Sequence, residues 1–222
     1  VKSVEFYAGA FSPEFGETTG GVVKVNLRDP RKDRFGGYVN VSLLSSSFLL
    51  EGPLSENDSI AVSGKRGFLD QYVKLAEQVE PDLREEVEFT RYPTYYDGSF
   101  IFNHEISGGN AIKLYGYGGL DTTEIIMAEE SESGRFSNKI SLDQTFLNVA
   151  GEWQLKEGAF TSVFSPRFGR NTIHYDFGPR AYFDLKWNQL SLSEKLEYRF
   201  NKAHRLKAGG RLDYGSVDFE SS

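Results

Sequence analysis

The 222-residue sequence contains no cysteine, which excludes disulfide bonds, thiolate metal sites and thiol-based catalysis. It also contains no apolar run near the roughly 18–20 residues that a membrane-spanning helix requires, and its mean hydropathy is −0.44. A membrane β-barrel lacks such runs too, because its strands alternate between lipid-facing and interior positions. The first residues do not show the basic and then apolar pattern of a signal peptide. Because Val1 falls inside a predicted strand, we expect the chain to be a fragment of a longer protein.

A net positive charge, clustered histidines and catalytic residue patterns are also lacking. The formal charge of −7 argues against a nucleic-acid partner. The three histidines do not have metal-ligand spacing, and the acidic stretch at 124–132 lacks the spaced oxygen ligands and central glycine of a calcium loop. Neither a serine, histidine and aspartate arrangement nor a carboxylate pair marks a catalytic centre. We therefore expect a protein that is not an enzyme and that carries no metal or cofactor.

Aromatic residues and glycine are abundant, with 18 Phe, 12 Tyr and 23 Gly. Apolar and polar residues alternate repeatedly after Pro30, which is typical of β-strands with two different faces. The alternation is cleanest at 190–200 and 206–214, where Leu196 and Leu212 stand against Lys195 and Arg211. These patterns predict nine strands after Pro30. Helical spacing of apolar residues predicts one short helix over 69–80.

The predicted connections differ in length at the two ends of the strands. Short turns are predicted at 55–58, 107–110, 156–158 and 201–204, and long excursions at 69–93, 121–138 and 166–179. Short turns on one rim and long loops on the other are typical of outer-membrane barrels. A bulge is predicted near Phe146, where the apolar residues of the sixth strand change face. Nine strands cannot close an all-antiparallel barrel, so we expect an incomplete one.

One face of the predicted strands is charged. In a soluble β-protein this would be an ordinary solvated face. In a plugged barrel it would contact the plug or water through ion pairs that are individually weak. Both interpretations stay open at this point. The residues concerned are Glu51, Glu105, Lys195, Glu197, Arg199, Lys207, Arg211 and Asp213.

The first thirty residues predict a strand, a glycine-bearing loop, Gly20-Gly21 and a second strand. In residues 4–30, VEFYAGAFSPEFGETTGGVVKVNLRDP, the chain resembles the end of the plug domain of the TonB-dependent outer-membrane receptors. Weaker likenesses to the family's first barrel segments follow, at LEGPL (50–54), PTYYD (93–97) and FNKAHRLKAGG (200–210). The resemblance extends over nearly the whole chain.

The resemblance implies an all-β, antiparallel transmembrane β-barrel fragment. Residues 1–30 would be the C-terminal end of a plug domain, and residues 31–222 the N-terminal part of a barrel of about 22 strands. It implies a ligand-gated receptor in the outer membrane of a Gram-negative bacterium, which imports a scarce nutrient with energy from the inner membrane. Its ligand class, whether siderophore, vitamin, carbohydrate or peptide, stays open.

The resemblance also implies partners. These are outer-membrane lipid, the small-molecule or oligomeric nutrient, a TonB-type energy-coupling protein and, as a further option, a surface lipoprotein. The TonB box that would contact the coupling protein is not in this sequence. Two alternatives stay open: a structural or adhesive outer-membrane barrel without active transport, and an independent soluble β-protein or barrel enzyme.

Two groups of residues are candidate functional sites. The first lies at the predicted plug–barrel junction, where glycines permit a tight turn and the segment would rearrange if a channel opens. The second lies where the longest loop returns to the barrel, where aromatics form an interfacial girdle or stack on a ligand. The junction residues are Glu14, Gly16, Gly20, Gly21 and Arg28, and the ligand candidates are Arg91, Tyr92, Tyr95 and Tyr96.

Overall fold

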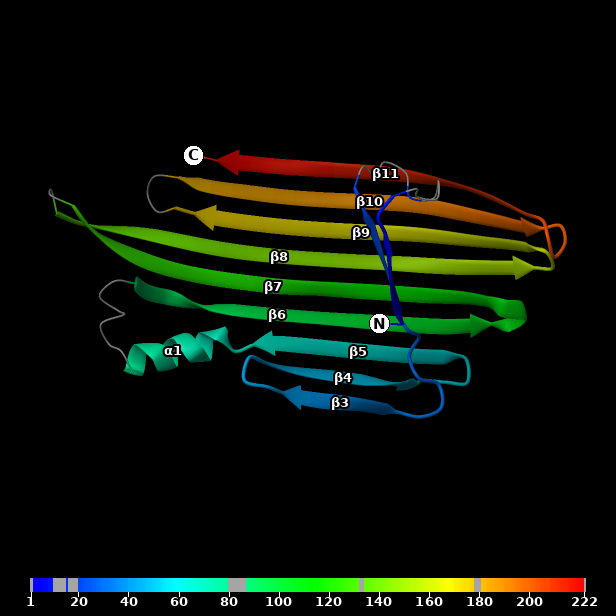
Figure 1. Ribbon diagram of the computed structural model, residues 1–222, viewed down its shortest axis with the longest axis horizontal. Coiled ribbons are helices and arrows are strands. Elements are labelled where there is room, and N and C mark those ends of the chain that lie inside the picture. Colours follow the sequence, from blue (N-terminus) through cyan, green and yellow to red (C-terminus); the bar gives the residue numbers. More distant parts are fainter. Residues whose placement is uncertain are drawn as a thin grey trace.

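A single antiparallel sheet dominates the computed structural model (Figure 1), which describes residues 2–9, 15, 20–79, 87–131, 134–177 and 181–221. Its nine strands follow one another in sequence order from β3 to β11, as predicted. They are β3 (Gly36–Val41), β4 (Ser45–Pro53), β5 (Asp58–Gly67), β6 (Val87–Ile106), β7 (Asn110–Ser131), β8 (Gly134–Glu157), β9 (Phe160–Asp176), β10 (Tyr182–Arg199) and β11 (Arg205–Ser221). Among the described residues, the edge strands β3 and β11 each pair with one neighbour only.

The predicted helix is present as α1 (Leu69–Val79) and starts directly after β5. Its buried Asp70 accepts a hydrogen bond from Arg66 of β5 at 2.8 Å, which fixes the helix to the strand. We call this end of the sheet the helix rim. The opposite end, the turn rim, carries the short connections at 54–57, 107–109, 158–159 and 200–204. No helix in the described ranges is both long enough and apolar enough to cross a membrane.

Two of the three predicted long loops are wrong. β7 runs to Ser131 and β8 starts at Gly134, so most of 121–138 is strand, and β9 continues through most of 166–179 to Asp176. Polar cross-strand partners such as Thr122 and Asp143 continue the ladder there. Backbone hydrogen bonds hold these strands together. The apolar residues there, such as Ile173 and Tyr175, lie on the face opposite to Phe168. The last predicted loop residues, 178–179, lie outside the described residues.

The predicted bulge near Phe146 is also wrong. β8 pairs with β7 and β9 without a register shift on either side of this residue. Ile140 and Leu142 lie on the opposite face from Leu147 because the alternation of β8 continues without interruption between these positions. The irregular pairing is instead in β6, between Phe89 and Thr94.

Cross-strand pairing gives the sheet two faces of different chemistry, because directly paired residues point to the same side. One continuous row contains Glu51, Ala61, Ile101, Tyr115, Ala150, Arg167, Ser191 and Asp213. The adjacent row contains Leu50, Val62, Phe100, Gly116, Val149, Phe168, Leu190 and Tyr214. We call the sides that carry these rows the polar face and the apolar face. All eight charged residues of the predicted charged face lie on the polar face.

Burial is inverted relative to a soluble protein. In β4, Glu51 is 5% exposed whereas its neighbour Leu50 is 57% exposed. Ala61 is the only buried hydrophobic residue in the described part of the chain. Several polar residues are buried instead: Glu51, Ser59, Asp70, Asn103, Ser141 and Ser191.

The apolar face is a band of limited height. In β10 its outward positions are apolar from Leu190 to Tyr198, apart from Glu194, and become polar at Asn188. Glu194 accepts a hydrogen bond from Ser162 of β9 at 2.5 Å, which satisfies one oxygen of this carboxylate on an otherwise apolar surface. In β11 the apolar positions run from residue 206 to residue 214. The height of the band matches the roughly 9–11 residues that a tilted strand needs to cross a bilayer core.

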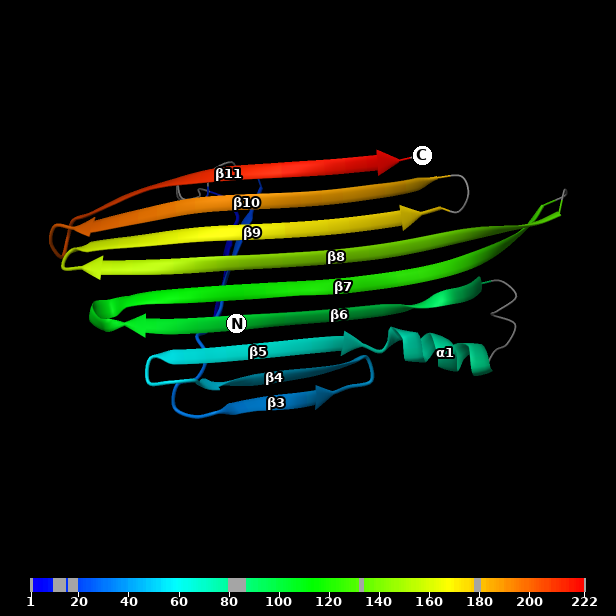
Figure 2. The same ribbon diagram turned by 180° about the vertical axis from the view of Figure 1, so that it is seen from behind.

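The remaining strands, β1 (Ser3–Tyr7) and β2 (Val22–Asn26), pair with each other and cross the sheet on one side (Figures 1 and 2). Val4 and Phe6 face the same way as their partners Val25 and Val23, and all four side chains are exposed. Isolated two-stranded ribbons are marginally stable in water. The described residues leave the apolar side of this ribbon exposed.

Candidate functional site

The segment between β2 and β3, residues 27–35, is the junction segment. It passes the turn rim and touches the polar face of the sheet through its side chains. Arg28 donates two hydrogen bonds to the carboxylate of Glu51 in β4, at 2.5 Å and 2.7 Å. Such a bidentate pair fixes orientation as well as distance. The hydrogen bonds to Glu51 raise the pKa of Arg28 above its ordinary value, so the guanidinium stays charged.

Asp29 adds a second attachment, to β6 and β7. Its Oδ1 atom accepts hydrogen bonds from Asn103 at 2.9 Å and from Lys113 at 2.6 Å. Burial alone would raise the pKa of Asp29. The bonds from Lys113 and Asn103 outweigh that effect and hold the pKa below its ordinary value. Asp29 is therefore ionised at neutral pH.

Lys32 forms a third attachment, an ion pair with Glu105 near the end of β6. Pro30, between the attachments, is buried. The junction segment is thus tied to three strands by charged and polar groups. Contacts of this type can be exchanged for water at lower cost than a packed apolar core, because both partners hydrate well.

The structure places the predicted junction residues in different surroundings. Glu14 and Gly16 lie outside the described residues. Gly20 is exposed, with no neighbouring atom near the place of a side chain. A Cβ on Gly21 would lie 3.1 Å from the ring of Phe6, so Gly21 permits close approach of β1 to the start of β2. Arg28 is the residue of this group that the structure places in a contact between the junction segment and the sheet.

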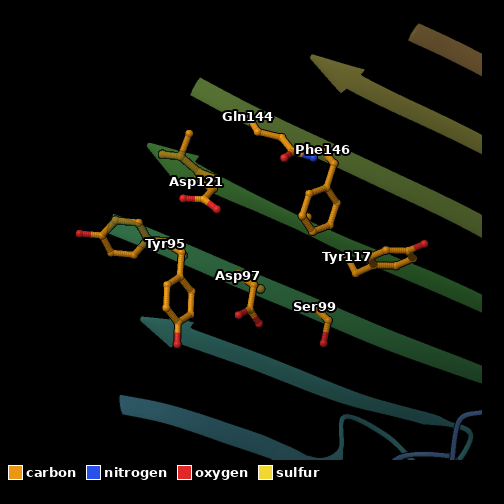
Figure 3. Close-up of a pocket in the computed structure, with 11 residues that line it drawn as sticks. Tyr95, Asp97, Ser99, Tyr117, Asp121, Gln144 and Phe146 are labelled. Carbon is orange, nitrogen blue, oxygen red and sulfur yellow. The ribbon is translucent and has the colours of Figure 1, made fainter. Parts of the chain in front are cut away.

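Toward the helix rim, the polar face is hollowed into a cavity of about 440 Å³, which we call the aromatic pocket (Figure 3). Strands β6, β7 and β8 line it. Its polar groups include Asp97, Asp121 and Gln144, and its rings include Tyr95, Tyr117 and Phe146. Pairing places all six on the polar face.

Glycines create the space in which the rings lie. A Cβ on Gly119 would come within 2.7 Å of the ring of Phe146, so this ring reaches from β8 across the bare backbone of β7. Tyr95 lies in the same way against Gly67 of β5. The rings of Tyr117 and Phe146 are tilted toward each other, with centroids 6.1 Å apart. The pocket therefore offers ring surfaces beside carboxylates.

The four predicted ligand residues do not form one cluster. Tyr95 and Tyr96 both line the pocket. The side chain of Tyr96 nevertheless points to the apolar face, where its hydroxyl accepts a hydrogen bond from Arg66 at 3.2 Å. Arg91 pairs with Asp143 at 2.5 Å and with Glu124 at 3.5 Å. The Nζ atom of Lys74 in α1 lies over the ring of Tyr92, 4.7 Å from the ring centroid. Two of the four predicted residues, Tyr95 and Tyr96, thus line the pocket, and Arg91 and Tyr92 contact other parts of the rim.

Sequence reasoning missed most of the site. Asp29, Asn103 and Lys113 are far apart in sequence and meet only through the sheet register. The pocket carboxylates Asp97 and Asp121 had one available signal, since they share a face with Tyr95 by alternation and pairing.

No group of three or more histidine or acidic residues in the described ranges is arranged to hold a metal ion. Comparisons with protein-family models, curated proteins and solved structures found no match.

Proposed function

We propose that this chain is part of a plugged outer-membrane β-barrel of the TonB-dependent receptor type, which imports a nutrient using energy from the inner membrane. The observation that carries the proposal is the inverted sheet, in which the polar face is partly covered and the apolar face is bare. A face with Leu50 at 57% and Tyr214 at 71% exposure is unfavourable in water and favourable in lipid.

The junction segment supports the plug part of the proposal. A plug inside a barrel must be held in place and yet be able to shift when ligand passes. Arg28, Asp29 and Lys32 supply attachments to the polar face that are specific in geometry but hydrophilic. The ribbon of β1 and β2, with its uncovered apolar side, fits the end of a larger plug domain.

The open edges support the barrel part. β3 and β11 present unpaired backbone groups along one side each in the described residues. Such edges are unfavourable in a membrane, where each free backbone group costs several kcal/mol. We propose that further strands of the full-length protein complete the wall. The outer membrane of a Gram-negative bacterium is the proposed location.

Expression of the full-length protein in a Gram-negative host tests this function without knowledge of the ligand. Solutes of a rich medium are compared by untargeted mass spectrometry after growth with and without the protein, and with and without a protonophore. We expect the protein in the outer-membrane fraction and a protein-dependent solute loss that the protonophore abolishes. Outer-membrane location without energy-dependent loss supports the structural or adhesive alternative. Absence from the outer membrane overturns the proposal.

A further inference from the structure

We propose that the aromatic pocket binds an organic cation, such as a quaternary or protonated amine, rather than a neutral or anionic ligand. This inference rests on the proposed function and names the ligand class of the receptor. It starts from the charge of the cavity. Asp97 and Asp121 both line it, and none of its lining residues within the described chain is basic.

The two carboxylates are close enough to act on one ligand. Tyr95 and Asp121 are direct cross-strand partners, and Asp97 lies two residues further along β6 on the same face. Diagonal neighbours of this kind lie about 7–8 Å apart. Neither carboxylate forms an ion pair with another described residue. A cation between them would therefore meet two carboxylates that form no ion pair within the described residues.

The aromatic rings of the pocket supply a second interaction with a cation. A cation is attracted to the face of an aromatic ring, and more strongly where water is partly excluded. Phe146 and Tyr95 lie against glycines, so their rings follow the floor of the pocket. In Figure 3, Phe146 and Tyr117 lie on one side of Asp97, and Asp121 lies on the other.

The protein already places an ammonium on one of these rings. Lys65 Nζ lies 5.4 Å from the centroid of Tyr95, and Lys65 is the cross-strand partner of Asp97. The lysine is exposed and does not form an ion pair with Asp97 in the described residues. It marks the ring as a cation-accepting surface and competes with a soluble cation for it.

Choline and its uncharged analogue 3,3-dimethylbutan-1-ol are suitable probes, because they share a shape and differ in charge. Binding to the purified full-length protein is measured by isothermal titration calorimetry. We expect choline to bind at least about tenfold more tightly than the alcohol, and its affinity to fall as salt is added. Equal affinity for the two probes, or preference for a neutral sugar or an anionic chelate, overturns the inference.

Variants localise the binding. Asp97→Asn and Asp121→Asn should each weaken choline binding, and Phe146→Leu should weaken it by removing a ring face. Lys65→Met should strengthen it, because a competing positive charge is removed. Glu56→Gln is the control, since it removes one negative charge from the exposed turn at 54–57. Unchanged affinity in both aspartate variants, in protein that still folds into the outer membrane, contradicts the assignment.

The two proposals fail in different ways. If neutral or anionic solutes are lost from the medium in an energy-dependent way and choline does not bind, the import function is supported and the organic-cation ligand class is contradicted. If choline binds but the protein imports nothing, the cation site is supported and the transport function is contradicted.

Discussion

Leu50 and Glu51 are neighbours in β4, yet Leu50 is 57% exposed and Glu51 is 5% exposed. The difference repeats across the middle of the sheet, where one face is bare and apolar while the other is polar and partly covered. Toward the helix rim, Val217 and Phe219 of β11 lie on the polar face. In water, the apolar face would be covered first. The proposed function accounts for this difference, because in a plugged membrane barrel apolar side chains face the lipid and charged groups face the interior.

The polar face itself has two unlike ends. At the turn rim, the junction segment fills it, with Arg28 and Asp29 paired to strand residues. Toward the helix rim, the same face is open and forms the aromatic pocket. One surface therefore combines a region that holds the junction segment in place and a region able to receive a ligand.

A charge placed on the apolar face should have the largest effect. Val149→Arg puts a guanidinium on the bare band, and we expect it to lower the free energy of unfolding in lipid vesicles by about 2–4 kcal/mol. The neighbouring change Asn148→Arg puts the same group on the polar face and should cost far less. Urea titration of the full-length protein in vesicles measures both. Equal costs would mean that the two faces do not differ in their surroundings.

Loss of the buried carboxylate at the junction should have the next largest effect. Glu51→Gln removes the charged partner of Arg28, and we expect the junction segment to lose about 1–3 kcal/mol of local stability. Hydrogen exchange of the amides at 28–34 reports this loss. The matched control is Glu105→Gln, which affects the more exposed pair with Lys32 and should cost at most about 1 kcal/mol. Similar exchange in both variants would contradict the special role of Glu51.

Acid should loosen the junction through Asp29. Its folded pKa lies below the ordinary value of 3.8, so ionised Asp29 stabilises the junction above that pH. The stabilisation is lost as the pH falls through the lower folded pKa. The protection factors of the amides at 28–34, which correct for slower intrinsic exchange in acid, should therefore fall below about pH 4, and fall less in Asp29→Asn. The same acid response in the variant would show that other groups control the junction.

The exposed ion pairs of Arg91 should matter least. Arg91 contacts Asp143 and Glu124, but its side chain is 48% exposed. We expect Arg91→Ala to change the free energy of unfolding by at most about 1 kcal/mol. Choline binding should stay unchanged, because Arg91 does not line the aromatic pocket. A large loss of binding would enlarge the proposed ligand site to include this residue.

The sequence predicted the fold better than the site. Alternation at 190–200 and 206–214 gave β10, β11 and their faces, because a period of two is local information. The sequence wrongly predicts loops where β7, β8 and β9 extend toward the helix rim, since pairing there depends on the partner strand and not on a regular apolar pattern. Asp29 and Lys113 meet only through strand register, which is a long-range property. Tyr95 and Tyr96 are predicted ligand residues that both line the pocket, whereas Arg91 and Tyr92, predicted with them, do not.

Spin labels at consecutive positions of β8 test the central claim most directly. The chain contains no cysteine, so single cysteines at Leu147, Asn148 and Val149 can be labelled in the full-length protein in bilayers. We predict that labels at Leu147 and Val149 collide with oxygen, which concentrates in lipid, and that the label at Asn148 does not. A polar nickel complex should show the opposite preference. Equal or reversed access at these three positions would contradict the account.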